Sequence, residues 1–277
     1  GVWEGKDSDG DLISVGETAL FKDRSEWLVK KIVNYLRENF SDNNLINMKV
    51  LEVGSYDGWV ITEICKEIDF KEVVGVEPRL KNIKKGEIGR KLANVKVNAE
   101  FIQGTAKDLE VLFPEQTFDI VICLGMLHHV SATYDTIQSL CKKSSGLTII
   151  DSMIIPELVN DKALIEPFVN TRDIIYYQEE PIWTVAAYKF ESPYGDGSRP
   201  DFGLANIPSR KLIEMSLKTC GFDRLEVLGT EEDFDDASLQ KLRGVKELLC
   251  VAKRDNDLLD QNDQWLKKVS ESENIFC

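Results

Sequence analysis

The sequence lacks most of the features that mark metal centres, disulfide frameworks and membrane spans. Its 277 residues include only two histidines, and its six cysteines form no CxxC pair. No apolar run reaches the roughly 18 to 20 residues that a membrane-spanning helix needs, and the amino terminus is not typical of a signal peptide. Several cysteines lie in apolar, strand-like segments, where a free thiol packs as a small hydrophobe. We therefore expect no metal, no membrane span, reduced thiols and a cytoplasmic location.

The sequence also lacks an excess of positive charge, because its 34 Lys and Arg residues are outnumbered by 48 Asp and Glu residues. The formal net charge is −14 and the sequence pI is near 4.8. A surface of this sign repels phosphate, so a nucleic-acid-binding protein would need a local basic patch. The basic segment 81–91 is more typical of a solvated helix face than of such a patch. The composition favours a small-molecule partner and leaves nucleic acid as the weaker alternative.

The pattern of apolar residues alternates between strands and helices over residues 48–151. Strands are expected at 48–53, 73–77, 97–102, 118–123 and 146–151. Helices are expected at 59–68, 80–92 and 132–143. This alternation is typical of right-handed crossovers that build a parallel sheet covered on both faces. An amphipathic helix over 25–38 precedes the pattern, and residues 1–24 look irregular.

Residues 152–206 break this alternation with aromatic, Pro and Gly residues, which is typical of a functional cap inserted into a domain. A helix is expected over 208–220, followed by two strands at 222–228 and 246–252. No crossover helix separates those strands, so they indicate an antiparallel end to the sheet. The predicted fold is α/β, a doubly wound Rossmann-like sheet of seven mostly parallel strands with an antiparallel last strand.

The expected organisation is one domain over residues 1–253, with the helix 25–38 and the cap inside it, and a helical tail over 254–277. The chain begins at Gly1 without an initiator methionine, so its relation to a longer protein is open. Its oligomeric state is equally open.

A glycine turn is the most informative local feature. The segment Lys49-Val-Leu-Glu-Val-Gly-Ser-Tyr-Asp-Gly58 reads as a buried strand followed by a tight turn. The helix that begins near Trp59 points free N–H groups toward an anionic ligand. Glu77 ends the second strand, where a carboxylate can accept the hydroxyls of a ribose. These residues predict a site for a nucleoside-containing cofactor, against the alternatives of a plain tight turn and a solvated glutamate.

These motifs resemble the class I S-adenosylmethionine-dependent methyltransferases. The first family motif is matched by Glu52-Val-Gly54-Ser-Tyr-Asp-Gly58, and the fourth strand by Phe118-Asp-Ile-Val-Ile-Cys-Leu-Gly125. Tyr56 replaces the middle glycine of the family. The resemblance covers roughly residues 25–252 and is nearest to a branch that includes enzymes carboxymethylating the wobble uridine of tRNA.

The resemblance implies S-adenosylmethionine as cofactor and a role for each matching residue. Gly54 and Ser55 would line the methionine moiety, Glu77 would bind the ribose, and Thr105 with Ala106 would form the adenine edge. Asp108 is a weaker candidate for the adenine, and Asp119 is expected to be structural. The full implied cofactor set is Glu52, Gly54, Ser55, Tyr56, Gly58, Glu77, Thr105, Ala106 and Leu124.

His128 and His129 follow the fourth strand, where such sheets place their ligands. His129 is the candidate general base, because an unperturbed imidazole titrates near neutral pH. The alternative is a role in packing and hydrogen bonding at the entry of the next helix. The two neighbouring side chains are expected to point in different directions, which argues against a shared metal.

The cap is expected to recognise the acceptor. Its aromatic residues would form an apolar wall and its arginines would hold an anionic group, although ordinary packing and solvation are the alternatives. The candidate substrate-binding residues are His128, Arg172, Tyr176, Tyr177, Trp183 and Arg199.

The leading hypothesis is methyl transfer to a small metabolite, a sugar or a natural-product intermediate. Transfer to a tRNA base is an alternative that the net charge opposes. An NAD-dependent oxidoreductase is another, since Gly54, Gly58 and Glu77 partly fit that fingerprint. A non-catalytic interaction module is the last, because Tyr56 in place of glycine could block the pocket.

Overall fold

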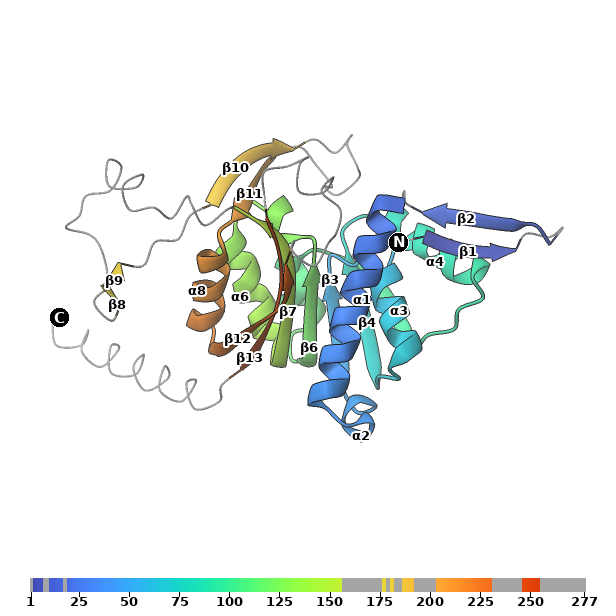
Figure 1. Ribbon diagram of the computed structural model, residues 1–277, viewed down its shortest axis with the longest axis horizontal. Coiled ribbons are helices and arrows are strands. Elements are labelled where there is room, and N and C mark those ends of the chain that lie inside the picture. Colours follow the sequence, from blue (N-terminus) through green and yellow to red (C-terminus); the bar gives the residue numbers. More distant parts are fainter. Residues whose placement is uncertain are drawn as a thin grey trace.

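A computed structural model describes residues 2–6, 10–16, 19–155, 176–177, 180–181, 186–191, 203–230 and 246–254. A seven-stranded sheet in the order β12-β13-β7-β6-β3-β4-β5 forms the centre of the molecule (Figure 1). The strand order reverses between β3 and β6, which is where doubly wound sheets bind their ligands. The predicted fold class is confirmed.

The parallel half of the sheet follows the predicted pattern closely. Its strands are β3 (Lys49–Val53), β4 (Glu72–Glu77), β5 (Ala99–Gln103) and β6 (Phe118–Leu124). The main helices that cross over between them are α3 (Trp59–Glu67) and α4 (Leu80–Leu92). The short elements η1 (Ala106–Asp108) and α5 (Leu109–Leu112) connect β5 to β6, and the short helix α2 (Asp42–Leu45) precedes β3. Each strand pairs in parallel with its neighbours. The buried, β-branched strand residues explain why both faces are covered by helices.

The other half of the sheet contains longer strands and an antiparallel pairing. Its strands are β7 (Ser144–Ile154), β12 (Phe222–Thr230) and β13 (Lys246–Arg254). β13 runs antiparallel to both β7 and β12, as predicted. Arg254 was expected to begin the helical tail, but it is the last residue of β13 and pairs with Phe222. The rest of the predicted tail, 255–277, and the loop 231–245 lie outside the described residues.

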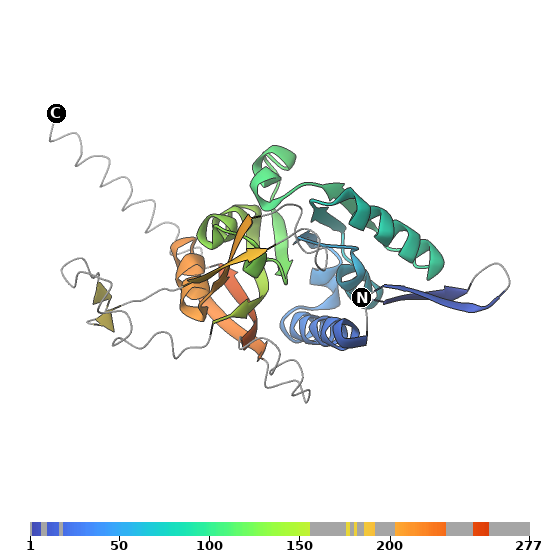
Figure 2. The same ribbon diagram turned by 90° about the horizontal axis from the view of Figure 1, so that it is seen from above.

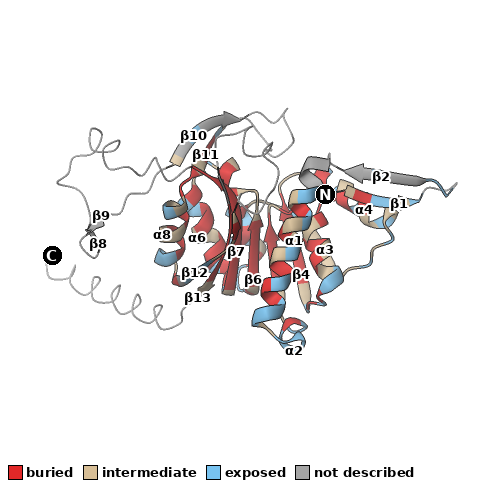
Figure 3. Ribbon diagram, in the orientation of Figure 1, coloured by how far each residue is buried: buried red, intermediate tan, exposed pale blue. Residues whose placement is uncertain are grey.

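Two helical layers cover the sheet (Figures 1 and 3). On one face, α1 (Ala19–Asn39) and α3 bury Leu28, Ile32 and Ile64 against it. On the other face lie α6 (Thr133–Lys143) and α8 (Arg210–Thr219), which contribute Leu140 and Leu217. The apolar residues of each helix recur at helical spacing, so one face of each is buried and the opposite face is exposed.

The expectation that residues 1–24 are irregular is wrong. β1 (Val2–Lys6) and β2 (Leu12–Gly16) form an antiparallel hairpin, and α1 begins at Ala19 instead of residue 25. Figure 2 shows this hairpin projecting away from the rest of the molecule, with β1 beginning beside the helices at the position marked N. Strands of five residues give too short a pattern to be recognised, and the contact that anchors β1 is made with α4, far along the chain.

The inserted segment between β7 and α8 is described in part. It contains β8 (Tyr176–Tyr177), β9 (Glu180–Pro181), β10 (Ala186–Glu191) and β11 (Gly203–Pro208). β10 and β11 form a hairpin, and β11 packs on η2 (Leu127–His129), which follows β6. The amide N–H of Asn206 donates to the carbonyl of Val130 over 2.8 Å. Part of the predicted cap therefore lies over the loop that carries the two histidines.

Candidate cofactor-binding site

The glycine turn after β3 lies against the end of β4. The amide N–H groups of Gly54 and Ser55 donate to the carbonyl of Val76 over 2.8 and 3.1 Å. Gly54 has a φ of +78°, and a Cβ at this position would lie 3.0 Å from the sulfur of Met126. Only glycine fits both the conformation and the space. The turn therefore presents its backbone at the point where the strand order reverses.

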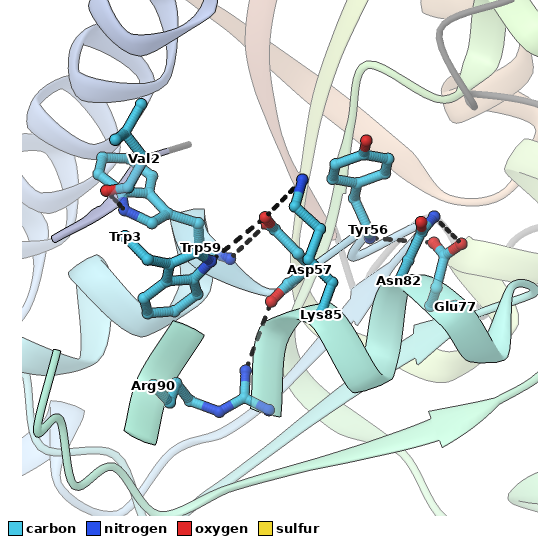
Figure 4. Close-up of polar contacts among 9 residues, drawn as sticks. All are labelled: Val2, Trp3, Tyr56, Asp57, Trp59, Glu77, Asn82, Lys85 and Arg90. Carbon is cyan, nitrogen blue, oxygen red and sulfur yellow. Dashed lines mark hydrogen bonds and ion pairs between the residues drawn. The ribbon is translucent and has the colours of Figure 1, made fainter. Parts of the chain in front are cut away.

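Glu77, the last residue of β4, lies beside this turn with 4% of its surface exposed. One carboxylate oxygen accepts the amide N–H of Tyr56 over 3.0 Å, while the other accepts from the amide N–H of Arg79 and from the side chain of Asn82 (Figure 4). Burial raises the pKa of Glu77, and these hydrogen bonds oppose the rise. A carboxylate accepts about four hydrogen bonds. Glu77 therefore has room for about one further donor.

Tyr56 occupies the position of the missing middle glycine and keeps the backbone shape that glycine allows. Its φ is 54°, in the left-handed region, which costs a non-glycine residue about 1 to 2 kcal/mol. The ring lies 4.9 Å from the Lys85 ammonium and points away from the Glu77 carboxylate (Figure 4). The side chain is partly exposed. The replacement is therefore accommodated without moving the amide that Glu77 accepts.

Two buried polar atoms near the turn have no hydrogen-bond partner in the described part of the chain. They are Oε2 of Glu52, on β3, and Oγ of Ser55. Burial, together with the nearby carboxylates of Asp57 and Glu77, raises the pKa of Glu52 to about 8. A buried polar atom without a partner is unfavourable by about 1 to 3 kcal/mol. Both atoms would be satisfied by a bound ligand that carries hydrogen-bond donors, an ammonium group above all.

The residues expected at the adenine edge follow β5. The Asp108 carboxylate accepts from both the amide N–H and the hydroxyl of Thr105, over 2.8 and 2.7 Å. These hydrogen bonds lower the pKa of Asp108. Thr105 in turn caps η1, and Ala106 is buried. Asp108 thus has a local capping partner, which makes it a poorer candidate for the adenine than the backbone around Ala106.

At the end of β6, the partly buried Leu124 is followed by Gly125, whose φ is +67°. The Gly125 amide N–H donates to the carbonyl of Asp151 over 2.9 Å. The Asp151 carboxylate is fully buried and pairs with the guanidinium of Arg24, which lies close above Gly125. Arg24 was not among the predicted site residues, because it lies in the segment interpreted as irregular. This arginine places a cation at the edge where the glycine turn also ends.

The two histidines lie together in η2. The amide N–H of Met153 donates to Nδ1 of the buried His128 over 3.3 Å, so a neutral His128 carries its proton on Nε2. His129 is partly exposed, and its ring centroid lies 4.2 Å from that of His128. The expectation that the rings point apart is wrong, because the tight turn of η2 brings them together. Among the described residues no three His, Cys, Asp or Glu side chains form a metal-binding group.

The remaining expected site residues are placed less fully. Arg172, Trp183 and Arg199 lie outside the described residues, and only the backbone of Tyr176 and Tyr177 is described, in β8. Asp119 accepts the amide N–H of Lys49 over 2.8 Å, which joins the starts of β6 and β3. No described helix is long and apolar enough to cross a membrane.

Sequence comparisons find relatives for part of the chain. Residues 50–144 match the family described as "Methyltransferase domain". The ubiquinone biosynthesis O-methyltransferase of Rickettsia akari is 26% identical over 132 residues, which are 47% of this chain and 48% of that protein. The same enzyme of Rickettsia canadensis is 25% identical over 153 residues, 54% of this chain and 58% of that protein. The chain thus spans about half the length of the curated relatives it matches.

Solved structures show the same fold at low identity. The N-terminal domain of EvdMO1 with bound S-adenosylhomocysteine (SAH) has a TM-score of 0.55 and 15% identity, covering 84% of this chain and 80% of that one. Magnesium protoporphyrin IX methyltransferase from Synechocystis PCC 6803, also with SAH, has a TM-score of 0.53 and 16% identity, covering 87% and 90%. Residues 50–144 are therefore similar to a methyltransferase family, and the chain has the Rossmann-like fold of these solved structures.

Proposed function

We propose that this chain is an S-adenosylmethionine-dependent methyltransferase acting on a small molecule. The observation that carries the proposal is the group of atoms around Gly54 that can still accept hydrogen bonds from a ligand. Gly54 leaves no side chain between its backbone and Met126, Glu77 has room for a hydroxyl donor, and Glu52 and Ser55 hold buried oxygen atoms without partners in the described chain. The family match over residues 50–144 supports the same activity.

The residues around the turn fit the parts of this cofactor. Glu77 would accept a ribose hydroxyl, and Ser55 with Glu52 would accept hydrogen bonds from the methionine ammonium. Arg24 would pair with the methionine carboxylate, since it is a partly exposed cation at the same edge of the sheet. The adenine would lie near Thr105 and Ala106. The cofactors named for the solved neighbours, SAH and S-adenosylmethionine, support this assignment.

When bound, the cofactor supplies a methyl group on a sulfonium, and a neutral leaving group departs. The chain therefore needs to align the acceptor and to exclude water more than to activate bonds. His128 would donate from Nε2, because its Nδ1 accepts the Met153 amide. His129, partly exposed beside it, is the proposed general base for an acceptor hydroxyl or ammonium.

The proposed acceptor is a small metabolite, sugar or natural-product intermediate. The curated relatives are named O-methyltransferases of ubiquinone biosynthesis, which supports a small acceptor and favours oxygen as the nucleophile. Transfer to tRNA is the weaker alternative, because the net charge of −14 repels a polyanion. Binding of tRNA with a steep salt dependence would reverse that order.

Calorimetry with S-adenosylmethionine, SAH and NADH tests the proposal before any acceptor is known. We expect the two sulfur-containing ligands to bind and NADH not to bind. Binding of NADH alone would contradict the proposal and favour an oxidoreductase. Binding of none of the three by folded protein would favour an interaction module. After a positive result, acceptor screening with SAH formation as the readout would identify the substrate.

A further inference from the structure

The first strand of the chain is anchored against helix α4. Trp3 of β1 is 1% exposed, and a Cβ at Gly89 would lie 2.3 Å from its ring. A Cβ at Gly5 would lie 2.1 Å from the carbonyl oxygen of Leu92. The two glycines therefore permit the strand and the helix to approach closely. β1 holds its place through this contact, although it pairs with no strand of the central sheet.

The Trp3 indole reaches the glycine turn through Asp57. Asp57 is 2% exposed, and its Oδ2 accepts the indole N–H of Trp3 over 3.2 Å (Figure 4). Oδ1 accepts the amide N–H of Trp59 over 3.2 Å, which fixes the start of α3. The Lys85 ammonium lies 3.4 Å from Oδ2, and Arg90 donates to the Asp57 carbonyl. Both carboxylate oxygens and the carbonyl oxygen of Asp57 are thus held by neighbours from β1, α3 or α4.

Asp57 directly follows Tyr56, the residue held in the left-handed conformation. In that conformation the Tyr56 amide N–H donates to Glu77 over 3.0 Å, and the strain must be offset by the surrounding contacts. A second bond ties the same elements together, because the Trp59 indole N–H donates to the Val2 carbonyl over 3.0 Å. The contacts of Trp3 therefore continue through Asp57 and Tyr56 to the Glu77 carboxylate.

We propose that Trp3 is a positioning residue for the cofactor site: its indole N–H holds Asp57 so that the Tyr56 turn keeps the shape required to bind the cofactor. This inference rests on the proposed function for its ligand. Trp3 touches none of the atoms proposed to bind the cofactor, so it acts through Asp57. The amino-terminal hairpin is then part of the binding machinery, in addition to its role in packing.

The test compares Trp3→Phe with wild-type chain. Phenylalanine keeps an aromatic ring against Gly89 and removes the N–H donor. We expect SAH affinity, measured by calorimetry, to fall about fivefold to tenfold, because binding would then have to order a turn that the indole N–H orders in wild type. Amide hydrogen exchange at Tyr56 and Trp59 should become faster in the cofactor-free protein. Trp27→Phe, on α1, is the matched control and should leave both readouts at wild-type values.

Asp57→Asn and the double variant separate positioning from packing. If the indole N–H acts through the negative charge of Asp57, Trp3→Phe should cause a smaller loss of SAH affinity in the Asp57→Asn background than in wild type, because the asparagine oxygen is a weaker acceptor than the carboxylate. The inference would be overturned if Trp3→Phe bound SAH with unchanged affinity and showed unchanged amide hydrogen exchange at Tyr56 and Trp59. This holds even if the free energy of unfolding of the variant falls. Wild-type protein that binds no SAH would contradict the proposed function. The exchange at Tyr56 and Trp59 would then still decide whether Trp3 positions the turn.

Discussion

The two halves of the sheet place their functional groups in different ways. In the parallel half, the candidate cofactor residues lie near the carboxyl end of a strand or in the turn after it, as Gly54 follows β3 and Glu77 ends β4. In the other half, β7 pairs with β13 across a long separation in the chain, with Ile154 opposite Lys246. The loop after β6 is covered by β11, which comes from the inserted segment. The candidate cofactor residues are thus recognisable from local sequence, whereas the surroundings of the loop after β6 come from distant segments.

The two halves of the sheet also differ in the partners that their buried carboxylates have. Around the glycine turn, burial raises the pKa of both Glu52 and Glu77, and their carboxylates retain capacity for outside donors. In the other half, the buried Asp151 is paired with Arg24 within the chain. A buried carboxylate is stabilised by hydrogen bonds or an opposite charge. The carboxylates around the glycine turn can thus accept hydrogen bonds from a ligand, whereas the carboxylate of Asp151 already has a cation beside it.

Gly58→Ala should give the largest loss of stability. Gly58 has a φ of +70°, and a Cβ there would lie 2.3 Å from the Phe101 ring. Strain and overpacking together predict a fall of about 2 to 5 kcal/mol in the free energy of unfolding. Gly125→Ala, at the end of β6, has a similar φ but more space, so about 1 to 2 kcal/mol is expected. Urea unfolding measures both, and equal losses would contradict the difference.

Glu77→Gln should weaken SAH binding by about 1 to 3 kcal/mol, because the amide cannot accept all the hydrogen bonds that the carboxylate accepts. The loss of stability should accompany it, since three donors already point at this side chain. Glu72→Gln, at the opposite end of the same strand, is the control and should bind SAH normally. Calorimetry decides, and equal affinity of the two variants would refute the role of Glu77.

Asn206→Ala tests whether the two halves act separately. The buried Asn206 side chain accepts from the Thr133 hydroxyl and donates to the Ser131 carbonyl. Its removal should lower the free energy of unfolding by about 1 to 2 kcal/mol. SAH affinity should stay at the wild-type value, since none of these groups lies at the glycine turn. A loss of SAH affinity as large as that of Glu77→Gln would show that the halves are coupled.

Titration of Glu52 should produce a smaller, pH-dependent change in the free energy of unfolding. Its pKa is about 8 in the folded chain against an ordinary 4.5, so the folded state favours the protonated form. The stability from this preference is fully present below pH 4.5 and is lost as pH rises toward 8. Between pH 7 and pH 8, wild type should lose about 1 kcal/mol relative to Glu52→Gln. Parallel pH profiles of the two proteins in urea unfolding would show that Glu52 does not titrate as described.

The sequence predicted the parallel half well because its signals are local. The predicted helix 80–92 coincides with α4, and the predicted strand 73–77 differs from β4 by one residue. The hairpin of β1 and β2 was missed, since Trp3 gains its burial from a helix more than eighty residues away. Arg24 was missed for the same reason, because its partner Asp151 lies on β7.

By itself, the sequence determined the fold class, the glycine turn and the carboxylate at the end of β4, because periodicity and turn chemistry act over a few residues. Only the tertiary structure decided that Tyr56 keeps a left-handed backbone, that Oε2 of Glu52 is buried without a partner among the described residues and that Trp3 reaches Asp57. These features depend on which distant side chains share a space. Long-range packing determines which of these side chains come into contact, and no local sequence pattern encodes those contacts.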